Sequence, residues 1–219
     1  HMEIALFLEA KRIYQDHLLD ILAPFIFEGI SKIYATANNM AHKSKDISNL
    51  NLIFKDLVNQ ISEWNSKTII EETIRIKKTS NSYPYLDDLC KAVIKTHLII
   101  CTHSNSVSSQ IAEEFFDQFE THDLIHRCYI EAGKYAYNNP FMFAIDIKSS
   151  KIEQKRIENS TLNLIKSILE SGMRKCLPFT LLLKEYLINA SFWSGGTMQI
   201  INRQVDASNV SQQQTQSKS

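Results

Sequence analysis

Apolar residues recur every three to four positions along most of the chain, a spacing that predicts amphipathic helices. The first of these helices spans residues 3–22, and Pro24 is expected to open a second, because proline fits the first turn of a helix. Further helices are predicted over residues 50–61, 66–78, 86–101, 109–118, 122–138 (with Thr121 as the N-cap), 151–171 and 179–193. The pattern therefore predicts an all-α fold, a single bundle of about eight helices.

Several residues mark the expected ends of these helices. Trp64 is predicted to be a packing anchor at a tight corner, and Asn65 to cap the helix that follows, since asparagine favours that position. Other predicted markers of helix ends are Pro84, Thr121, Ser150 with Glu153, Gly172 and Pro178.

The last predicted helix, residues 178–193, is apolar nearly all round its circumference. A helix of that composition usually lies buried, so we expect this C-terminal helix at the centre of the bundle. The helical domain then covers residues 2–193, with His1 and Met2 resembling a cloning remnant. Residues 194–219 are polar and almost uncharged, which predicts a flexible tail unless a partner holds it.

The charge balance and the cysteines narrow the class of protein. Lys plus Arg and Asp plus Glu both number 24, whereas a dedicated nucleic-acid binder usually carries a basic excess. Four cysteines lie at helical spacing among apolar residues, and none forms a CxxC pair; they are Cys90, Cys101, Cys128 and Cys176. We expect buried free thiols in a reducing intracellular compartment. No uncharged apolar run approaches about 18 residues, so no membrane span is expected.

Two pairs of side chains have the spacing of helical metal ligands. His122 and His126 are four residues apart, as are His97 and Cys101, so each pair shares one helix face. A site would form only if the two helices packed together. The alternative interpretation is that His97 and Cys101 fill the core. No catalytic nucleophile, phosphate loop or cofactor motif is recognisable, so neither catalytic residues nor a cofactor is expected.

Two basic runs are the candidate nucleic-acid contacts. They consist of Arg75, Lys77 and Lys78, and then of Lys148, Lys151, Lys155 and Arg156. The alternative is that both are solvated helix ends, where positive charge near a C-terminus also complements the helix dipole. Arg75 is further expected to pair with Glu71 one helical turn earlier.

Several segments, taken in order, resemble an uncharacterised family of proteins from large nucleocytoplasmic DNA viruses, giant viruses of amoebae such as marseilleviruses. The segments are residues 61–65, 69–76, 85–94, 126–130, 137–141 and 174–178, within a resemblance that covers residues 3–190. The resemblance implies a life in the host cytoplasm, in a virus factory or in the virion. It implies no chemical activity.

The sequence thus favours a non-enzymatic helical scaffold or interaction protein. Its expected partner is a viral or host protein, a second copy of the chain included, since soluble oligomers most often pair with two-fold symmetry. Two alternatives stay open. One is a nucleic-acid-associated viral factor that uses the basic runs, and the other is a metal-dependent enzyme built around His122 and His126.

Overall fold

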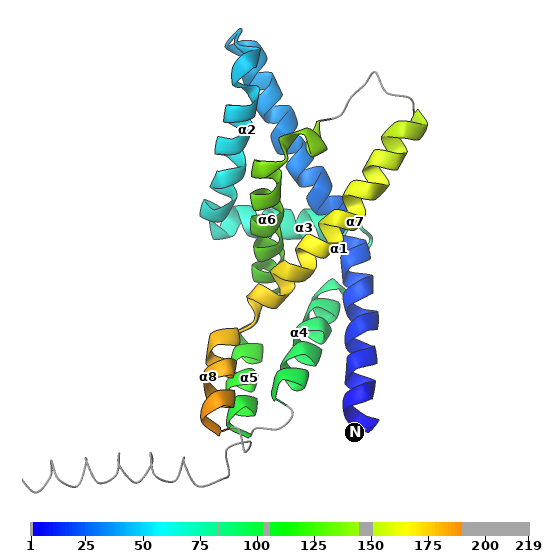
Figure 1. Ribbon diagram of the computed structural model, residues 1–219, viewed down its shortest axis with the longest axis vertical. Coiled ribbons are helices and arrows are strands. Elements are labelled where there is room, and N and C mark those ends of the chain that lie inside the picture. The colour runs from blue at the N-terminus through cyan, green and yellow to red at the C-terminus, as the bar shows by residue number, and fades with distance from the viewer. Residues whose placement is uncertain (1, 83, 103–105, 145–150, 190–219) are drawn as a thin grey trace, which may run out of the picture.

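The computed structural model confirms the all-α prediction. It describes residues 2–82, 84–102, 106–144 and 151–189, and within these ranges it contains eight α-helices, three short 3₁₀ helices and no strand (Figure 1). The α-helices are α1 (Met2–Lys43), α2 (Leu50–Asn59), α3 (Ser66–Thr79), α4 (Leu86–Thr102), α5 (Ser106–Gln118), α6 (Thr121–Asn138), α7 (Lys151–Cys176) and α8 (Phe179–Asn189). The 3₁₀ helices are η1 (Ile47–Asn49), η2 (Gln60–Glu63) and η3 (Pro140–Phe143).

Pro24 does not open a second helix. It lies inside α1, which continues through it for 42 residues, so the predicted break after residue 22 is wrong. Figure 1 shows the axis of α1 turning about midway along its length, as expected of a helix bent by an internal proline. A proline inside a helix costs about 3 kcal/mol. Complete burial of Leu22, Ala23 and Ile26 beside it offsets that cost, because each large apolar side chain contributes about 1.5–3 kcal/mol.

The centre of the bundle is formed by α1 and α6. α6 packs against α1, α2, α3, α4 and α7, and α1 also packs against α2, α4 and α7. The fully buried side chains Ile30, Leu124 and Cys128 lie on these two helices. α1 and α6 therefore occupy the middle, and the helices around them cover their apolar side chains.

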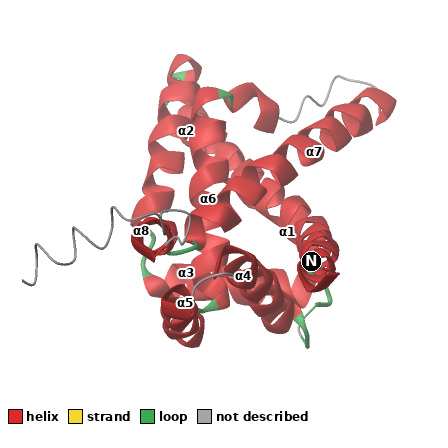
Figure 2. Ribbon diagram, turned by 60° about the horizontal axis from the view of Figure 1, so that its bottom comes forward, coloured by secondary structure: helices red, strands yellow, loops and turns green. Residues whose placement is uncertain are grey.

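The prediction of a central C-terminal helix is wrong for the part that the structure describes. α8 lies at one end of the molecule beside α5, as Figure 2 shows. Among its described side chains Leu182 is buried, whereas Phe179 and Leu187 are more than half exposed. An apolar circumference did not bring burial, because α8 has a helix to pack against on one side. Residues 190–193, and the tail predicted from residue 194, lie outside the described residues.

Several predicted helix ends can be compared with the structure. The Asn65 side chain accepts a hydrogen bond from the Thr68 backbone N–H at 3.0 Å, which confirms the predicted cap. Pro178 directly precedes α8, and Pro84 lies two residues before α4. Thr121 is wrong as a cap, since it is the first residue of α6. Of the predicted capping pair at α7, Ser150 lies outside the described residues.

Gly172 lies inside α7 and not just before its end, so the predicted helix end there is wrong. A Cβ atom built on Gly172 would come within 3.2 Å of the Cα atom of Cys128 on α6. Glycine is therefore favoured there by the crossing of α6 and α7, whose backbones approach closely.

A partly buried polar network joins α1, α3 and α6. The Tyr129 hydroxyl of α6 donates to the carboxylate of Glu72 on α3, which also receives two hydrogen bonds of 2.8 Å from Arg75. Arg75 reaches α1 as well, donating at 3.1 Å to both Glu28 and the backbone carbonyl of Phe25. The predicted Arg75–Glu71 pair is wrong, because Glu72 is the residue that faces the core.

The network depends on a close approach at Gly29 of α1. A Cβ atom at Gly29 would lie 2.1 Å from the Tyr129 hydroxyl oxygen. The hydroxyl is held by Glu72, so it cannot swing aside without breaking this partly buried hydrogen bond.

Gly29→Ala is accordingly expected to lower the free energy of unfolding by about 1–3 kcal/mol, the usual cost of overpacking. Gly133→Ala on α6 is the matched control, because its Cβ first meets the mobile Cδ1 end of Ile61, at 2.9 Å. Urea unfolding measures both, and equal effects of the two substitutions would contradict the proposed role of the Tyr129 hydroxyl.

Candidate functional site

The four candidate metal ligands do not come together. His97 and Cys101 line one cavity, and His122 lines a different one. His126 hydrogen-bonds through Nε2 to the backbone carbonyl of Ile61 at 2.7 Å. In the part of the chain that the structure describes, no three His, Cys, Asp or Glu side chains are grouped as metal ligands would be.

Trp64 is a packing anchor, as predicted. Its indole stacks on the His126 ring with centroids 6.2 Å apart and contacts the Tyr129 ring at 5.1 Å. His126 therefore serves to hold the corner between η2 and α3 against α6.

The hollow with the most distinctive chemistry is a cavity of about 420 Å³ between α1, α4, α7 and α8. Its lining residues are Lys11, His97, Ile100, Cys101, Arg174, Lys175, Leu177 and Phe179. Cavities of 300–1,000 Å³ with apolar walls and a few polar groups are typical of small-molecule sites. We call it the His97 cavity.

Three cations and no carboxylate line the His97 cavity. Lys175 reaches Glu131 at 2.5 Å, and Arg174 lies 3.8 Å from Glu170. Among the described residues no ion pair involves Lys11. The cavity is therefore positively charged. Of its three cations, Lys11 is the one without a carboxylate partner among the described residues.

His97 is the polar residue buried in the wall of this cavity, with 6% of its surface exposed. Its Nδ1 atom lies 2.8 Å from the carbonyl of Val93, and a carbonyl only accepts, so Nδ1 carries the proton. Burial, together with the nearby charges of Lys11 and Arg174, lowers the pKa of His97 and keeps the ring neutral at pH 7. Nε2 is then an acceptor, and it is buried without a partner among the described residues.

The cysteines follow the prediction of buried free thiols only in part. All four are free, and Cys90 and Cys128 are buried, but Cys101 is exposed at the His97 cavity. Burial raises the pKa of the Cys101 thiol, and it raises that of Cys176 to about 11. These thiols are therefore protonated at neutral pH, and a thiol is a weak nucleophile.

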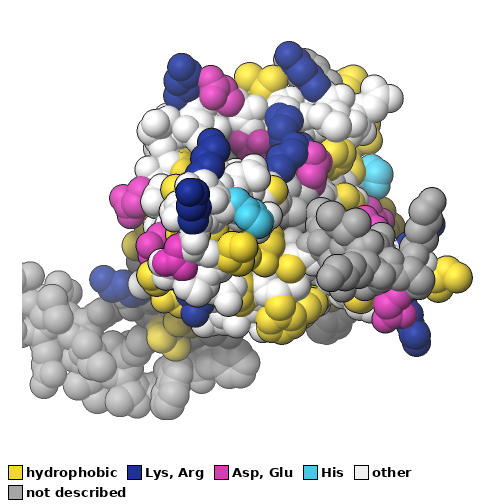
Figure 3. Space-filling model, turned by 90° about the horizontal axis from the view of Figure 1, so that it is seen from above, with side chains coloured by type: hydrophobic (Ala, Val, Ile, Leu, Met, Phe, Trp, Pro, Cys, Tyr) yellow, Lys and Arg dark blue, Asp and Glu magenta, His cyan; other side chains and the backbone are white. Residues whose placement is uncertain are grey.

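The first basic run does not form an open patch. Arg75 is held in the partly buried network, and Lys77 forms an ion pair with Asp87 at 2.7 Å, which leaves Lys78 exposed. In the second run Lys155 and Arg156 are exposed on α7. Lys148 and the side chain of Lys151 lie outside what the structure describes. On the face drawn in Figure 3, Lys and Arg side chains are scattered among Asp and Glu.

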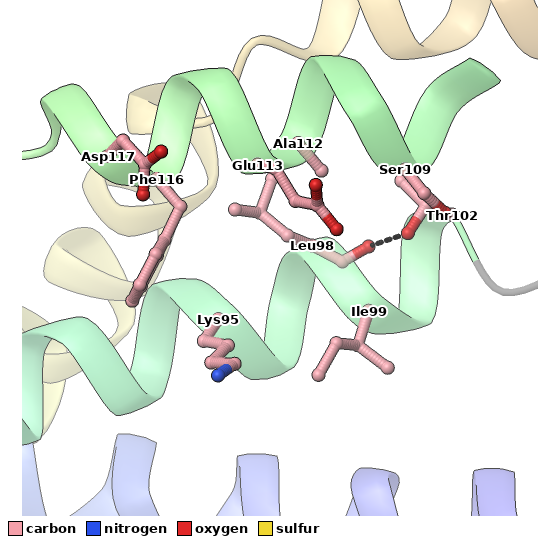
Figure 4. A pocket seen from close by; sticks show the side chains of 9 residues that line it. All are labelled: Lys95, Leu98, Ile99, Thr102, Ser109, Ala112, Glu113, Phe116 and Asp117. Atoms are coloured by element: carbon pink, nitrogen blue, oxygen red, sulfur yellow. Dashed lines mark hydrogen bonds between the residues drawn. The ribbon is translucent and has the colours of Figure 1, made fainter. Parts of the chain in front are cut away.

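A second hollow, of about 250 Å³, lies between α4 and α5. Figure 4 shows Phe116 extending from α5 toward α4, where the Lys95 ammonium lies 5.6 Å from its ring centroid. The Thr102 hydroxyl donates back to the Leu98 carbonyl of its own helix at 2.9 Å (Figure 4). The buried Thr102 hydroxyl thus has a hydrogen-bond partner within α4, whereas Nε2 of His97 has none among the described residues.

The same end of the molecule exposes apolar side chains. On α8, Phe179, Leu183 and Leu187 follow one another at intervals of four residues and are 43–59% exposed. Residues four apart on a helix share one face, so they form a continuous apolar stripe. We call it the α8 stripe. On α1, Leu6 and Ile13 are also more than half exposed.

Sequence reasoning missed the His97 cavity although it singled out two of its residues. The available signal was Lys11, a cation at an apolar position of the first helical pattern. The cavity also needs Arg174 and Phe179, and their distance from Lys11 along the chain gave no indication that they meet.

Comparisons with known proteins give one match. Residues 4–144, more than half of the chain, match the model of a family described as a family of unknown function, DUF5764. No curated protein and no solved structure matches the chain. Among the described residues, no helix combines the length and apolar character that crossing a membrane requires.

Glu131, which holds Lys175 at the cavity edge, gives a pH-dependent contribution to stability. Burial by itself raises the pKa of Glu131, but hydrogen bonds from Lys175 and Lys134 outweigh it, so its pKa lies below the ordinary 4.5. A carboxylate with a lowered pKa stabilises the fold above pH 4.5 and loses that contribution as pH falls below it.

Glu131→Gln is therefore expected to lower the free energy of unfolding at pH 7 by about 1–2 kcal/mol, a value kept small because both lysines are half exposed. The difference from the wild type should shrink as pH falls from 4.5 toward 3. Urea unfolding across pH measures it, with exposed Glu63→Gln as control. A difference that stayed constant with pH would contradict the assignment.

Proposed function

The chain belongs to the DUF5764 family, and we propose that it is a non-enzymatic helical scaffold protein that pairs with a second copy of itself through α8. The observation that carries the proposal is the α8 stripe. Large apolar side chains in a contiguous exposed row are typical of protein–protein contact sites.

The geometry of the stripe favours a helical partner. Phe179, Leu183 and Leu187 lie at the spacing of residues that insert between the side chains of a facing helix. A second α8 related by two-fold symmetry offers the same residues in the opposite direction. Such a self-complementary contact is the commonest way in which soluble proteins form oligomers.

Two features support a role without chemistry of its own. The buried Tyr129 and the half-buried Glu72 and Arg75 form a hydrogen-bonded chain and thereby fix helices in place. The thiols have raised pKa values, which makes them poor nucleophiles.

We further propose that the protein acts in a giant-virus infection, in the virus factory of the host cytoplasm or in the virion. The support is the ordered set of sequence segments that resembles proteins of these viruses. Mass spectrometry of purified particles and of infected-cell fractions tests the setting. Detection in neither would contradict it.

The alternative of nucleic-acid binding is supported by Lys155 and Arg156, which are exposed on the first turns of α7. Glu153 and Glu158 lie on the same turns and reduce the positive potential there. Binding to DNA or RNA that falls steeply with salt would favour this alternative over the scaffold.

The double substitution Leu183→Asp with Leu187→Asp is expected to abolish self-association. Each dimer would bury four aspartates in place of leucines, so the dissociation constant should rise by about a hundredfold or more. Sedimentation velocity over a range of concentrations measures it, and the wild type should approach the mass of two chains.

The matched control is Ile152→Asp with Ile157→Asp, which makes the same change of charge at exposed positions of α7. This control should associate as the wild type does. A wild type that stayed monomeric at every concentration, or a control that dissociated equally, would contradict pairing through α8.

A further inference from the structure

We infer that the His97 cavity binds an aliphatic carboxylate of medium chain length, with its carboxyl group at Lys11 and its chain along the apolar wall. The inference concerns a small-molecule site and does not depend on pairing through α8. Three properties of the cavity carry it.

The first property is the shape and chemistry of the wall. Ile100, Leu177 and Phe179 provide apolar surface from three different segments, and the hollow, which is open to solvent on one side, has a volume of about 420 Å³. A cavity with so little polar lining favours a ligand that is hydrocarbon over most of its length. The Cys101 thiol, which is protonated, adds to this wall as a small apolar group.

The second property is the sign of the charge. The cavity is lined by cations alone, and Arg174 and Lys175 already have carboxylate partners in Glu170 and Glu131. Lys11 has no ion pair among the described residues, so an anionic group is the ligand part that best complements it. An aliphatic ammonium would instead be repelled.

The third property is the state of His97, which forms part of the wall. Its Nδ1 donates to the Val93 carbonyl, and its Nε2 is a buried acceptor without a partner among the described residues. The neutral ring has no proton to donate from Nε2 to a carboxylate, so the carboxyl group is placed at Lys11, whose ammonium donates.

Binding is measured by titration calorimetry with dodecanoate, kept below its micelle concentration, on the full chain. Dodecan-1-ol and dodecyltrimethylammonium serve as neutral and cationic probes of equal chain length. Dodecanoate should bind at least tenfold more tightly than either. Equal binding of the three probes would overturn the inference.

Lys11→Gln should weaken dodecanoate binding roughly tenfold, in line with the loss of a charged hydrogen bond, and leave dodecan-1-ol unchanged. Lys43→Gln, an exposed lysine at the far end of the same helix, is the matched control. The inference fails if the two variants bind dodecanoate equally well.

Cys101 reports on occupancy without any substitution. It is exposed at the cavity, whereas the partly exposed Cys176 is absent from the lining. Dodecanoate should slow alkylation of Cys101 by iodoacetamide at least fivefold and leave Cys176 unaffected, as resolved by peptide mass spectrometry. Unchanged alkylation of Cys101 at saturating dodecanoate would show that the ligand binds elsewhere and would overturn the assignment.

Discussion

The contact between Gly29 and the Tyr129 hydroxyl is the constraint on which the helical arrangement depends. It lets α1 and α6 approach closely enough for the hydroxyl to reach Glu72, which in turn holds Arg75. Arg75 then hydrogen-bonds back to α1, so three helices are joined through polar groups that water would otherwise satisfy. Buried polar groups of this kind stabilise a fold only when every partner is present, which ties the positions of α1, α3 and α6 together.

Because α1 is held at this junction, its two halves pack against different helices. One half extends beyond Pro24 to pack against α2, and the other runs back along α4 to one end of the bundle. There it brings Lys11 to the cavity whose wall contains His97 and Phe179. The continuity of the helix through Pro24 thus links the structural centre to the candidate ligand site.

The end of the molecule that α8 occupies carries both the His97 cavity and the α8 stripe. α8 contributes Phe179 to the cavity and displays Leu183 and Leu187 to solvent. The rest of the described surface at α7 carries charged residues of both signs. Contact with another protein and binding of a small amphiphile are therefore both expected at this end, and Phe179 belongs to both surfaces.

The sequence by itself determined the helical class, the corner at Trp64 and the cap at Asn65, because these depend on residues within a few positions of one another. It did not determine whether a helix would end at Pro24 or Gly172, or where α8 would lie in the bundle. A proline ends a helix unless flanking burial outweighs its cost, and an apolar helix is central only if others cover it. Both conditions concern neighbours distant in the chain. The meeting of Lys11, His97 and Arg174 was likewise decided by the tertiary structure alone, since a cavity is formed by the packing of four helices and has no pattern within any one of them.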